Sequence, residues 1–167
     1  MKILVASATA KASTGLAAFD KALNKVGLDN YNLIRLSSVI PPGAKVVVNK
    51  GKIKTKDLSG GWGDRLYVVM AELRTITPNT EAWAGMGWVQ DKNTGKGLFV
   101  EHEGFSKNSV KDSINDSLES MMKYRKDCDF GSIKTEICGI ACEDHPVSAL
   151  VIAAYQTSGW DDTAAKS

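Results

Sequence analysis

The stretch NLIRLSSVIPPG, residues 32–43, places two adjacent serines between a leucine- and isoleucine-rich run and a pair of prolines. The first half predicts a strand, because branched and aliphatic residues are typical of strands. The prolines cannot continue a hydrogen-bonded ladder, so they and the following glycine predict a turn. That turn explains the prolines, but it leaves the serine pair, Ser37 and Ser38, without a role.

Hydrophobic spacing on both sides of this stretch predicts the other elements. Residues 15–26 form an expected helix, with Ser13 or Thr14 as its cap and Gly27 at its end. Its apolar stripe is expected to consist of Leu16, Phe19, Leu23 and Val26. A second amphipathic helix is expected after Gly104, with Ser106 as its cap.

Apolar runs of strand type fill most of the remaining sequence. They are expected as strands over residues 2–8 and 65–73, as a hairpin over 81–104, and as strands over 135–144 and 149–156. Residues 157–167 are expected to form a loose tail. Two helices that each arrive between groups of strands predict an α+β fold, a layered sandwich.

Lysines recur at every second position from Lys50 to Lys56, which would place them on one face of an extended ribbon over residues 45–56. Such a face suits either a nucleic acid or water, and a solvated, edge-protecting face is the preferred interpretation. The net charge of +2 supports this preference, because it provides no strong field for a nucleic acid or an anionic membrane.

Length and composition limit the classes of protein that the chain can represent. Its 167 residues predict a single domain, and no apolar run reaches the roughly 18 to 20 residues that span a bilayer. Three cysteines are an odd number, which argues against a disulfide framework and for a reducing, cytoplasmic location.

Neither histidine, His102 or His145, has partners at a recognised metal-binding spacing, and Cys138 with Cys142 would supply only two ligands. These cysteines are therefore expected in the core, and no metal is predicted. The chain also lacks the glycine-rich motifs that bind nucleotide phosphates.

Two carboxylates stand out in LFVEHEG, residues 98–104, because Glu101 and Glu103 share one face at the end of an apolar strand. Partial burial would suit one of them to proton donation near neutral pH, whereas full exposure would make both of them solvated surface acids. Asp20 lies beside the apolar stripe of the first helix and, considered alone, is expected to be a surface acid.

Four segments together resemble the pyruvoyl-dependent arginine decarboxylases over most of the chain. They are STGLAAFDKAL, NLIRLSSVIPPG, GLFVEHEG and IACEDHPVSALVIAAY, in this order. The second is similar to the family's self-cleavage motif, and the third to the segment with its catalytic glutamate. The resemblance implies the layered α/β/β/α sandwich of the pyruvoyl-dependent histidine and arginine decarboxylases.

The same resemblance implies a role for the serine pair. Ser38 Oγ would attack the Ser37 carbonyl, and the chain would separate into a β chain, 1–37, and an α chain, 38–167. The new end at position 38 would carry a covalent pyruvoyl group, the cofactor, which forms a Schiff base with the amine of the substrate. The implied reaction converts L-arginine to agmatine and carbon dioxide.

Further roles follow from the resemblance alone. Glu101 would protonate the substrate carbon after carbon dioxide leaves, Asn32 and Ser37 would bind near the reacting end, and Asp20 would receive the guanidinium. The active protein would be a homotrimer of cleaved protomers, with its active sites at subunit interfaces. Two alternatives remain open: a pyruvoyl decarboxylase for another amino acid, and a non-catalytic homologue.

Overall fold

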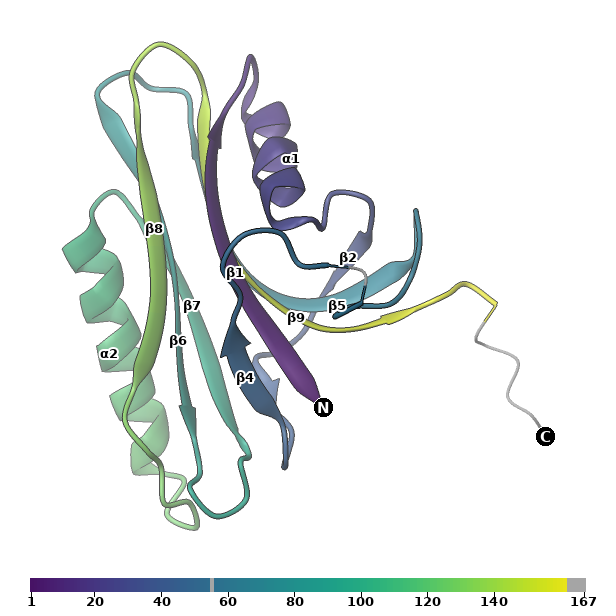
Figure 1. Cartoon of the computed structure of the whole chain (residues 1–167). Coiled ribbons are helices and arrows are strands. Elements are labelled where there is room, and N and C mark those ends of the chain that lie inside the picture. Colours follow the sequence, from purple (N-terminus) through teal and green to yellow (C-terminus); the bar gives the residue numbers. More distant parts are fainter. Residues whose placement is uncertain (55, 162–167) are drawn as a thin grey trace.

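The computed structural model describes residues 1–54 and 56–161 (Figure 1). In chain order the elements are β1 (Lys2–Lys11), α1 (Gly15–Val26), β2 (Asn32–Arg35), β3 (Val39–Ile40), β4 (Lys45–Val48), β5 (Arg65–Thr75), β6 (Thr80–Gln90), β7 (Gly97–Gly104), α2 (Lys107–Lys123), β8 (Lys134–Cys142) and β9 (Val147–Ser158). The described residues form a mixed α+β fold with two helices and two sheets, compatible with the expected sandwich.

The strands form two sheets that face each other. The first sheet has the order β2-β5-β9-β1-β4, and the second has the order β3-β7-β6-β8. β9 pairs with β1 on one side and with β5 on the other. Val151 and Ala153 of β9 belong to the core between the sheets, whereas Leu150 and Ile152 belong to the core beneath α1. Both faces of β9 are buried, and this explains its nearly continuous apolar sequence.

α1 packs on the outer face of the first sheet, and the Thr14 hydroxyl accepts a hydrogen bond from the Ala17 amide at its start. The buried side of α1 includes Ala18 and Ala22, while Leu16 is 66% exposed. The prediction that Leu16 joins the apolar stripe is therefore wrong. The burial pattern centres the buried face on the two alanines, and this turns Leu16 toward the surface.

α2 covers the outer face of the second sheet through Val110, Ile114 and Leu118, and the Ser106 side chain caps its start as predicted. A Cβ atom at Gly87 of β6 would lie 2.2 Å from Ile114 Cγ2. This close approach requires glycine, because the added atom would clash with the helix. None of the helices in residues 1–54 and 56–161 is long and apolar enough to cross a bilayer.

The hairpin of β6 and β7 is confirmed, and Asp91 fixes its turn. The Thr94 hydroxyl and amide and the Asn93 amide all donate to Asp91 Oδ1, while the Asp129 amide donates to Oδ2. These hydrogen bonds, led by that of the Thr94 hydroxyl, lower the pKa of the Asp91 carboxyl to about 2. The turn thereby holds β7 in register with β6.

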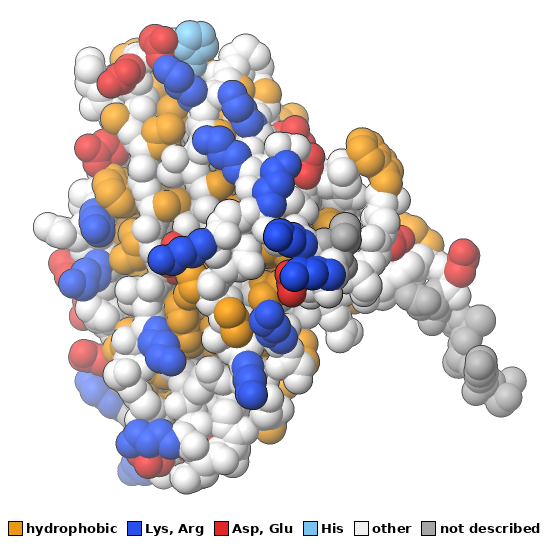
Figure 2. Space-filling view, viewed as in Figure 1, with side chains coloured by type: hydrophobic (Ala, Val, Ile, Leu, Met, Phe, Trp, Pro, Cys, Tyr) orange, Lys and Arg blue, Asp and Glu red, His pale blue; other side chains and the backbone are white. Residues whose placement is uncertain are grey.

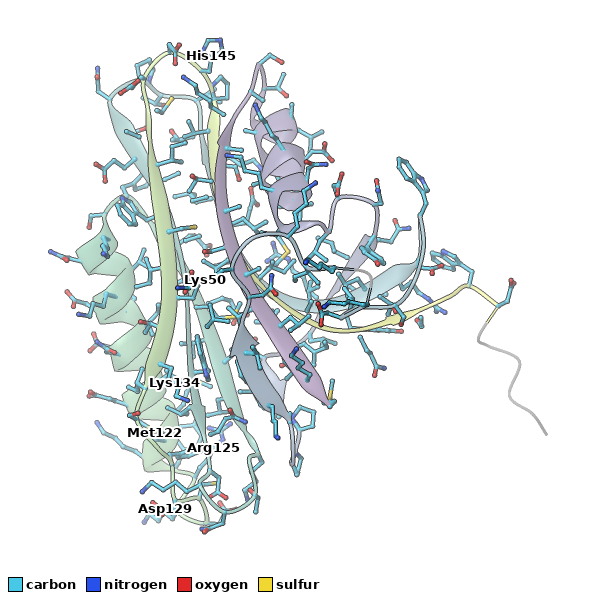
Figure 3. The ribbon with its side chains drawn as sticks, in the orientation of Figure 1. Lys50, Met122, Arg125, Asp129, Lys134 and His145 are labelled. Atoms are coloured by element: carbon cyan, nitrogen blue, oxygen red, sulfur yellow. The ribbon has the colours of Figure 1, made fainter. Side chains whose placement is uncertain are left out.

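The lysine-rich segment differs from its prediction. The strand β4 ends at Val48, and the described residues that follow it up to residue 56 form a loop. Gly51 has φ +81° and the buried Ile53 packs beneath α1, so a turn and an inward side chain interrupt the extended pattern. Lys50 is exposed in this loop (Figure 3), and Figure 2 shows lysines and arginines dispersed over the same face.

The expected loose tail is also partly wrong. β9 continues to Ser158, and the Trp160 indole donates a hydrogen bond to the Gly63 carbonyl at 2.9 Å. Residues 157–160 are therefore held against the loop before β5, and residues 162–167 of the predicted tail lie outside the described part of the chain. In Figure 1, β2 and the neighbouring ends of β5 and β9 extend to the side as an arm of the first sheet.

Candidate functional site

The serine pair lies where the chain passes from one sheet to the other. β2 is the edge strand of the first sheet, paired with β5, and β3 is the edge strand of the second, paired with β7. The pairing of β2 with β5 extends to Leu36, whose amide donates to the Val68 carbonyl. Ser37 and Ser38 follow Leu36 and directly precede β3. The predicted stop of the strand at the serines is confirmed, and it marks a change of sheet.

Ser38 has a strained backbone, with φ at +69° in the left-handed region. This conformation costs a residue with a side chain about 1 to 2 kcal/mol, so neighbouring contacts must maintain it. The Phe99 amide donates to the Ser38 carbonyl at 2.8 Å, and the Tyr155 hydroxyl donates to the Val39 carbonyl at 2.9 Å. Two successive carbonyls are thus held from two different sheets.

The hydroxyl of Ser38 lies against the carboxylate of Glu101. Ser38 Oγ is 2.8 Å from Oε1 and 2.9 Å from Oε2 of Glu101, and both residues are partly buried. A serine hydroxyl carries one proton, so it donates to one of these oxygens at a time. Glu103, two residues farther along the same face of β7, is exposed. The structure therefore distinguishes the two carboxylates that the sequence pattern treated alike.

Two other predicted site residues lie on the surface of the chain. Asp20 is exposed on α1, and Asn32 is exposed at the start of β2, where its Nδ2 donates to the Gly63 carbonyl at 2.6 Å. Within the described residues, neither side chain forms a hydrogen bond with Ser38 or Glu101. A single chain therefore unites Ser38 with Glu101, but it does not bring Asp20 or Asn32 to them.

A small cavity is lined by residues that precede and follow the serine pair in the chain. Its volume is about 240 Å³. It is lined by Met1, Leu36, Pro41, Tyr67, Tyr155 and Gln156. Another cavity, of about 340 Å³, is lined by Val39 and Ile40 of β3 together with Arg125 and Phe130. The first shares Tyr155 with the surroundings of Ser38, so it is the cavity that we associate with the serine pair.

Comparison with known proteins agrees with this geometry. The sequence profile of the family described as pyruvoyl-dependent arginine decarboxylase matches residues 2–158. The chain belongs to this family. It is 35% identical over 159 residues to the pyruvoyl-dependent arginine decarboxylase of Halobacterium salinarum, a match that covers 94% of this chain and 95% of that protein. It is 30% identical over 152 residues to that of Thermococcus kodakarensis, covering 90% and 92%.

Members of the pyruvoyl-dependent arginine decarboxylase family depend on a covalent pyruvoyl group, and position 38 fits such a group. The side chain of residue 38 points at a carboxylate, and its backbone carbonyl already has the Phe99 amide as a donor. The ketone carbon would be Cα of residue 38, with Cβ as its methyl group and an oxygen from water in place of the backbone nitrogen, and it would remain beside Glu101. Ser38, Phe99 and Glu101 are thus the residues that would hold the cofactor.

Tyr155 and Phe99 were not among the predicted site residues. Tyr155 packs edge-on against Phe99, with ring centroids 6.2 Å apart. Burial, and to a lesser extent the charge of Glu101, raises the pKa of the Tyr155 hydroxyl, which therefore stays protonated as a donor. A signal was present, because Tyr155 follows Val151 and Ala153 at period two on the inward face of β9.

The histidines and cysteines occupy structural positions. His102 Nε2 lies 2.8 Å from Ser117 Oγ of α2, while His145 lies in the β8–β9 turn beside Asp144 (Figure 3). Cys142 is buried and Cys138 is partly buried, and burial raises the pKa of the Cys138 thiol to about 11. In residues 1–54 and 56–161, no three His, Cys, Asp or Glu side chains are grouped as metal ligands.

Proposed function

We propose that this protein decarboxylates L-arginine to agmatine and carbon dioxide, using a pyruvoyl group that it makes from its own residue 38. The observation that carries the proposal is the contact of the Ser38 hydroxyl with Glu101 at a residue whose backbone is strained. Family membership supports it, because the relatives from Halobacterium salinarum and Thermococcus kodakarensis are named for arginine decarboxylation.

Self-cleavage would begin at the Ser38 hydroxyl. Its Oγ attacks the Ser37 carbonyl carbon while Glu101 takes the hydroxyl proton. The bond from that carbon to the residue 38 nitrogen breaks, the nitrogen gains a proton, and an ester joins the two residues. Loss of the Cα proton then breaks the Cβ–O bond and releases the Ser37 carboxylate. One water molecule hydrolyses the remaining dehydroalanine to a pyruvoyl group and ammonia.

The two products, 1–37 and 38–167, would stay together after cleavage. The first contains β1, α1 and β2, and β1 pairs with β9 from Leu4 to Lys11. β2 pairs with β5, and α1 buries Leu23 and Val26 on the same sheet. These contacts join the two fragments without the peptide bond between residues 37 and 38, so the fragments would form one folded unit.

In the cleaved protein, the ketone of the pyruvoyl group supplies the carbonyl that condenses with the substrate amine and accepts electrons as carbon dioxide leaves. The Glu101 carboxyl lies beside the side chain of residue 38, and in its protonated form it would donate a proton to the substrate carbon. The Phe99 amide would hold the carbonyl of residue 38 during this step. The same glutamate therefore serves as base in cleavage and as acid in turnover.

Asp20, Asn32 and Ser37 would bind the substrate. Asp20 is an exposed carboxylate, which can pair with a planar guanidinium through two hydrogen bonds. Asn32 donates one of its two side-chain amide hydrogens to the Gly63 carbonyl, and its amide oxygen can accept a hydrogen bond from the substrate. Ser37 would contribute the carboxylate released at the end of the smaller fragment.

A complete site needs more than one chain. Each strand residue advances about 3.3 Å, so Asn32 lies roughly 10 Å from Arg35 along β2, and further residues separate Arg35 from Ser38. Asn32 therefore cannot reach the Ser38 of its own chain. We infer a homotrimer with sites at subunit interfaces, in which one protomer supplies residue 38 with Glu101 and another supplies Asn32 and Asp20.

Two broader expectations accompany this proposal. The order of α1, first sheet, second sheet and α2 is consistent with the four-layered sandwich of the pyruvoyl-dependent histidine and arginine decarboxylases. Three unpaired cysteines support a reducing, cytoplasmic location. The net charge of +2 provides no strong field, so we expect neither a nucleic acid nor a membrane as a partner.

The substrate assignment predicts a specific effect at Asp20. We expect the protein to release carbon dioxide from L-arginine in preference to ornithine, lysine and histidine. Asp20→Asn should raise KM for arginine roughly 10- to 100-fold, because a hydrogen bond to a charged partner contributes about 1.5 to 3 kcal/mol. Asp116→Asn, an exposed helix acid on α2, is the matched control and should leave KM unchanged. Equal turnover of all four amino acids would contradict the assignment.

A complementation experiment with the same variant tests the shared site. The Asp20→Asn chain and the Glu101→Gln chain are produced together in one cell, so that mixed trimers form. If the two residues serve one site from different protomers, some sites in the mixture contain both native side chains, and activity with low KM returns. A mixture no more active than the separate variants would contradict the shared site.

A further inference from the structure

The hydroxyl of Tyr155 is the polar group of β9 that touches the chain beside the serine pair. It donates to the Val39 carbonyl at 2.9 Å, across 116 positions of sequence. It belongs to the first sheet, whereas Val39 begins β3 of the second sheet. The hydrogen bond therefore joins the two sheets directly after residue 38.

We propose that Tyr155 is a positioning residue for residue 38, an inference that rests on the proposed function. Its hydroxyl anchors the Val39 carbonyl while the Phe99 amide anchors the Ser38 carbonyl. With both carbonyls fixed, the backbone of Ser38 is held in the left-handed region and its Oγ is held on Glu101. Tyr155 thus acts through residue 38 and does not take part in the chemistry.

The surroundings of Tyr155 make its hydrogen bond rigid. Tyr155 is 8% exposed, and its ring packs against Phe99, the residue whose amide holds the Ser38 carbonyl. Burial, and to a lesser extent the charge of Glu101, raises the pKa of the phenol, which keeps its proton for the Val39 carbonyl. The hydrogen bond is part-buried, so a Val39 carbonyl left without this donor is costly and β3 would shift if the hydroxyl were removed.

The same anchor would persist after cleavage. Val39 becomes the second residue of the 38–167 fragment, and a new chain terminus loses the restraint of its former neighbour. Tyr155 and Phe99 then remain as the two donors that hold the first two carbonyls of this fragment. The two hydrogen bonds that hold the strained backbone of Ser38 before cleavage therefore orient residue 38 during turnover.

Tyr155→Phe tests this role, because it removes the hydroxyl and keeps the ring packing. Tyr67→Phe is the matched control: Tyr67 lines the same cavity, and its hydroxyl accepts a hydrogen bond from the Ser158 hydroxyl at 3.3 Å, on the first sheet and not on β3. Newly translated full-length chains are sampled over time on a denaturing gel. We expect cleavage of Tyr155→Phe to be roughly tenfold slower than in the native chain, and Tyr67→Phe to stay within about twofold.

A second measurement separates positioning from general destabilisation and needs no cleavage. In a Ser38→Ala background, amide hydrogen exchange is compared with and without Tyr155→Phe. The Phe99 amide should exchange about tenfold faster without the hydroxyl, while amides in the centre of β9 keep their rates. Equal cleavage of the two phenylalanine variants, or an unchanged Phe99 exchange rate, overturns the role of Tyr155. A native chain that never cleaves overturns the proposed function instead, and the exchange comparison still decides this inference.

Discussion

Ser38→Ala should leave the chain whole, at 18.0 kDa, and without detectable decarboxylation. The substitution removes Oγ, the atom that attacks the preceding carbonyl in the proposed cleavage, and with it the source of the ketone. Because both the cleavage and the cofactor depend on that oxygen, the expected loss is complete. A denaturing gel and a carbon dioxide assay on the same preparation measure both effects.

Ser37→Ala is the control for this prediction. Ser37 supplies only a backbone carbonyl to the cleavage, and its side chain is exposed, so alanine at position 37 should still allow the chain to separate. Two fragments from Ser38→Ala would show that another group attacks the bond. An intact Ser37→Ala chain would show that the Ser37 side chain has a role that the contacts of Ser38 do not reveal.

Glu101→Gln should lower turnover per cleaved chain by about 100-fold or more, the range expected when a general acid is lost. Glutamine keeps the shape of the side chain and an oxygen that accepts the Ser38 hydroxyl, so the chain should still cleave, at a reduced rate. The amide has no acid proton to give to the substrate carbon. Turnover is measured by single-turnover carbon dioxide release, normalised to the cleaved fraction found by mass spectrometry.

Glu103→Gln makes the same chemical change two residues away. Glu103 lies on the same face of β7 but is exposed, whereas Glu101 contacts Ser38. We therefore expect a turnover close to that of the native protein. Near-native turnover in Glu101→Gln, or a greater loss in Glu103→Gln, would mean that the acid was assigned to the wrong carboxylate.

Local sequence patterns predicted the elements of the fold well where one face is clearly apolar. The β6–β7 hairpin and both helix caps follow from residues close together in sequence, such as Ser106 and Thr14. The lysine segment was wrong because spacing alone could not reveal that Gly51 turns the chain and that Ile53 is drawn under α1. Leu16 was misplaced because a helix's buried face depends on the sheet beneath it.

The site was harder to predict than the fold, because its contacts join distant parts of the sequence. The family resemblance led to Ser38 and Glu101, which lie 63 positions apart and meet in the structure. Period two could not separate Glu101 from Glu103, since only the crossing of the chain between sheets makes their surroundings different. Tyr155 was missed for a similar reason: its partner, the Val39 carbonyl, is a backbone atom that no side-chain pattern encodes.

Intact mass spectrometry of the purified native protein under denaturing conditions tests the central claim most directly. We predict two species, residues 1–37 ending in a free carboxylate and residues 38–167 beginning with a pyruvoyl group. The larger species should react with a carbonyl reagent such as a hydrazine, and its mass should increase accordingly. A single, unreactive species of 18.0 kDa would contradict the account, because the chain would then have no ketone with which to decarboxylate an amino acid.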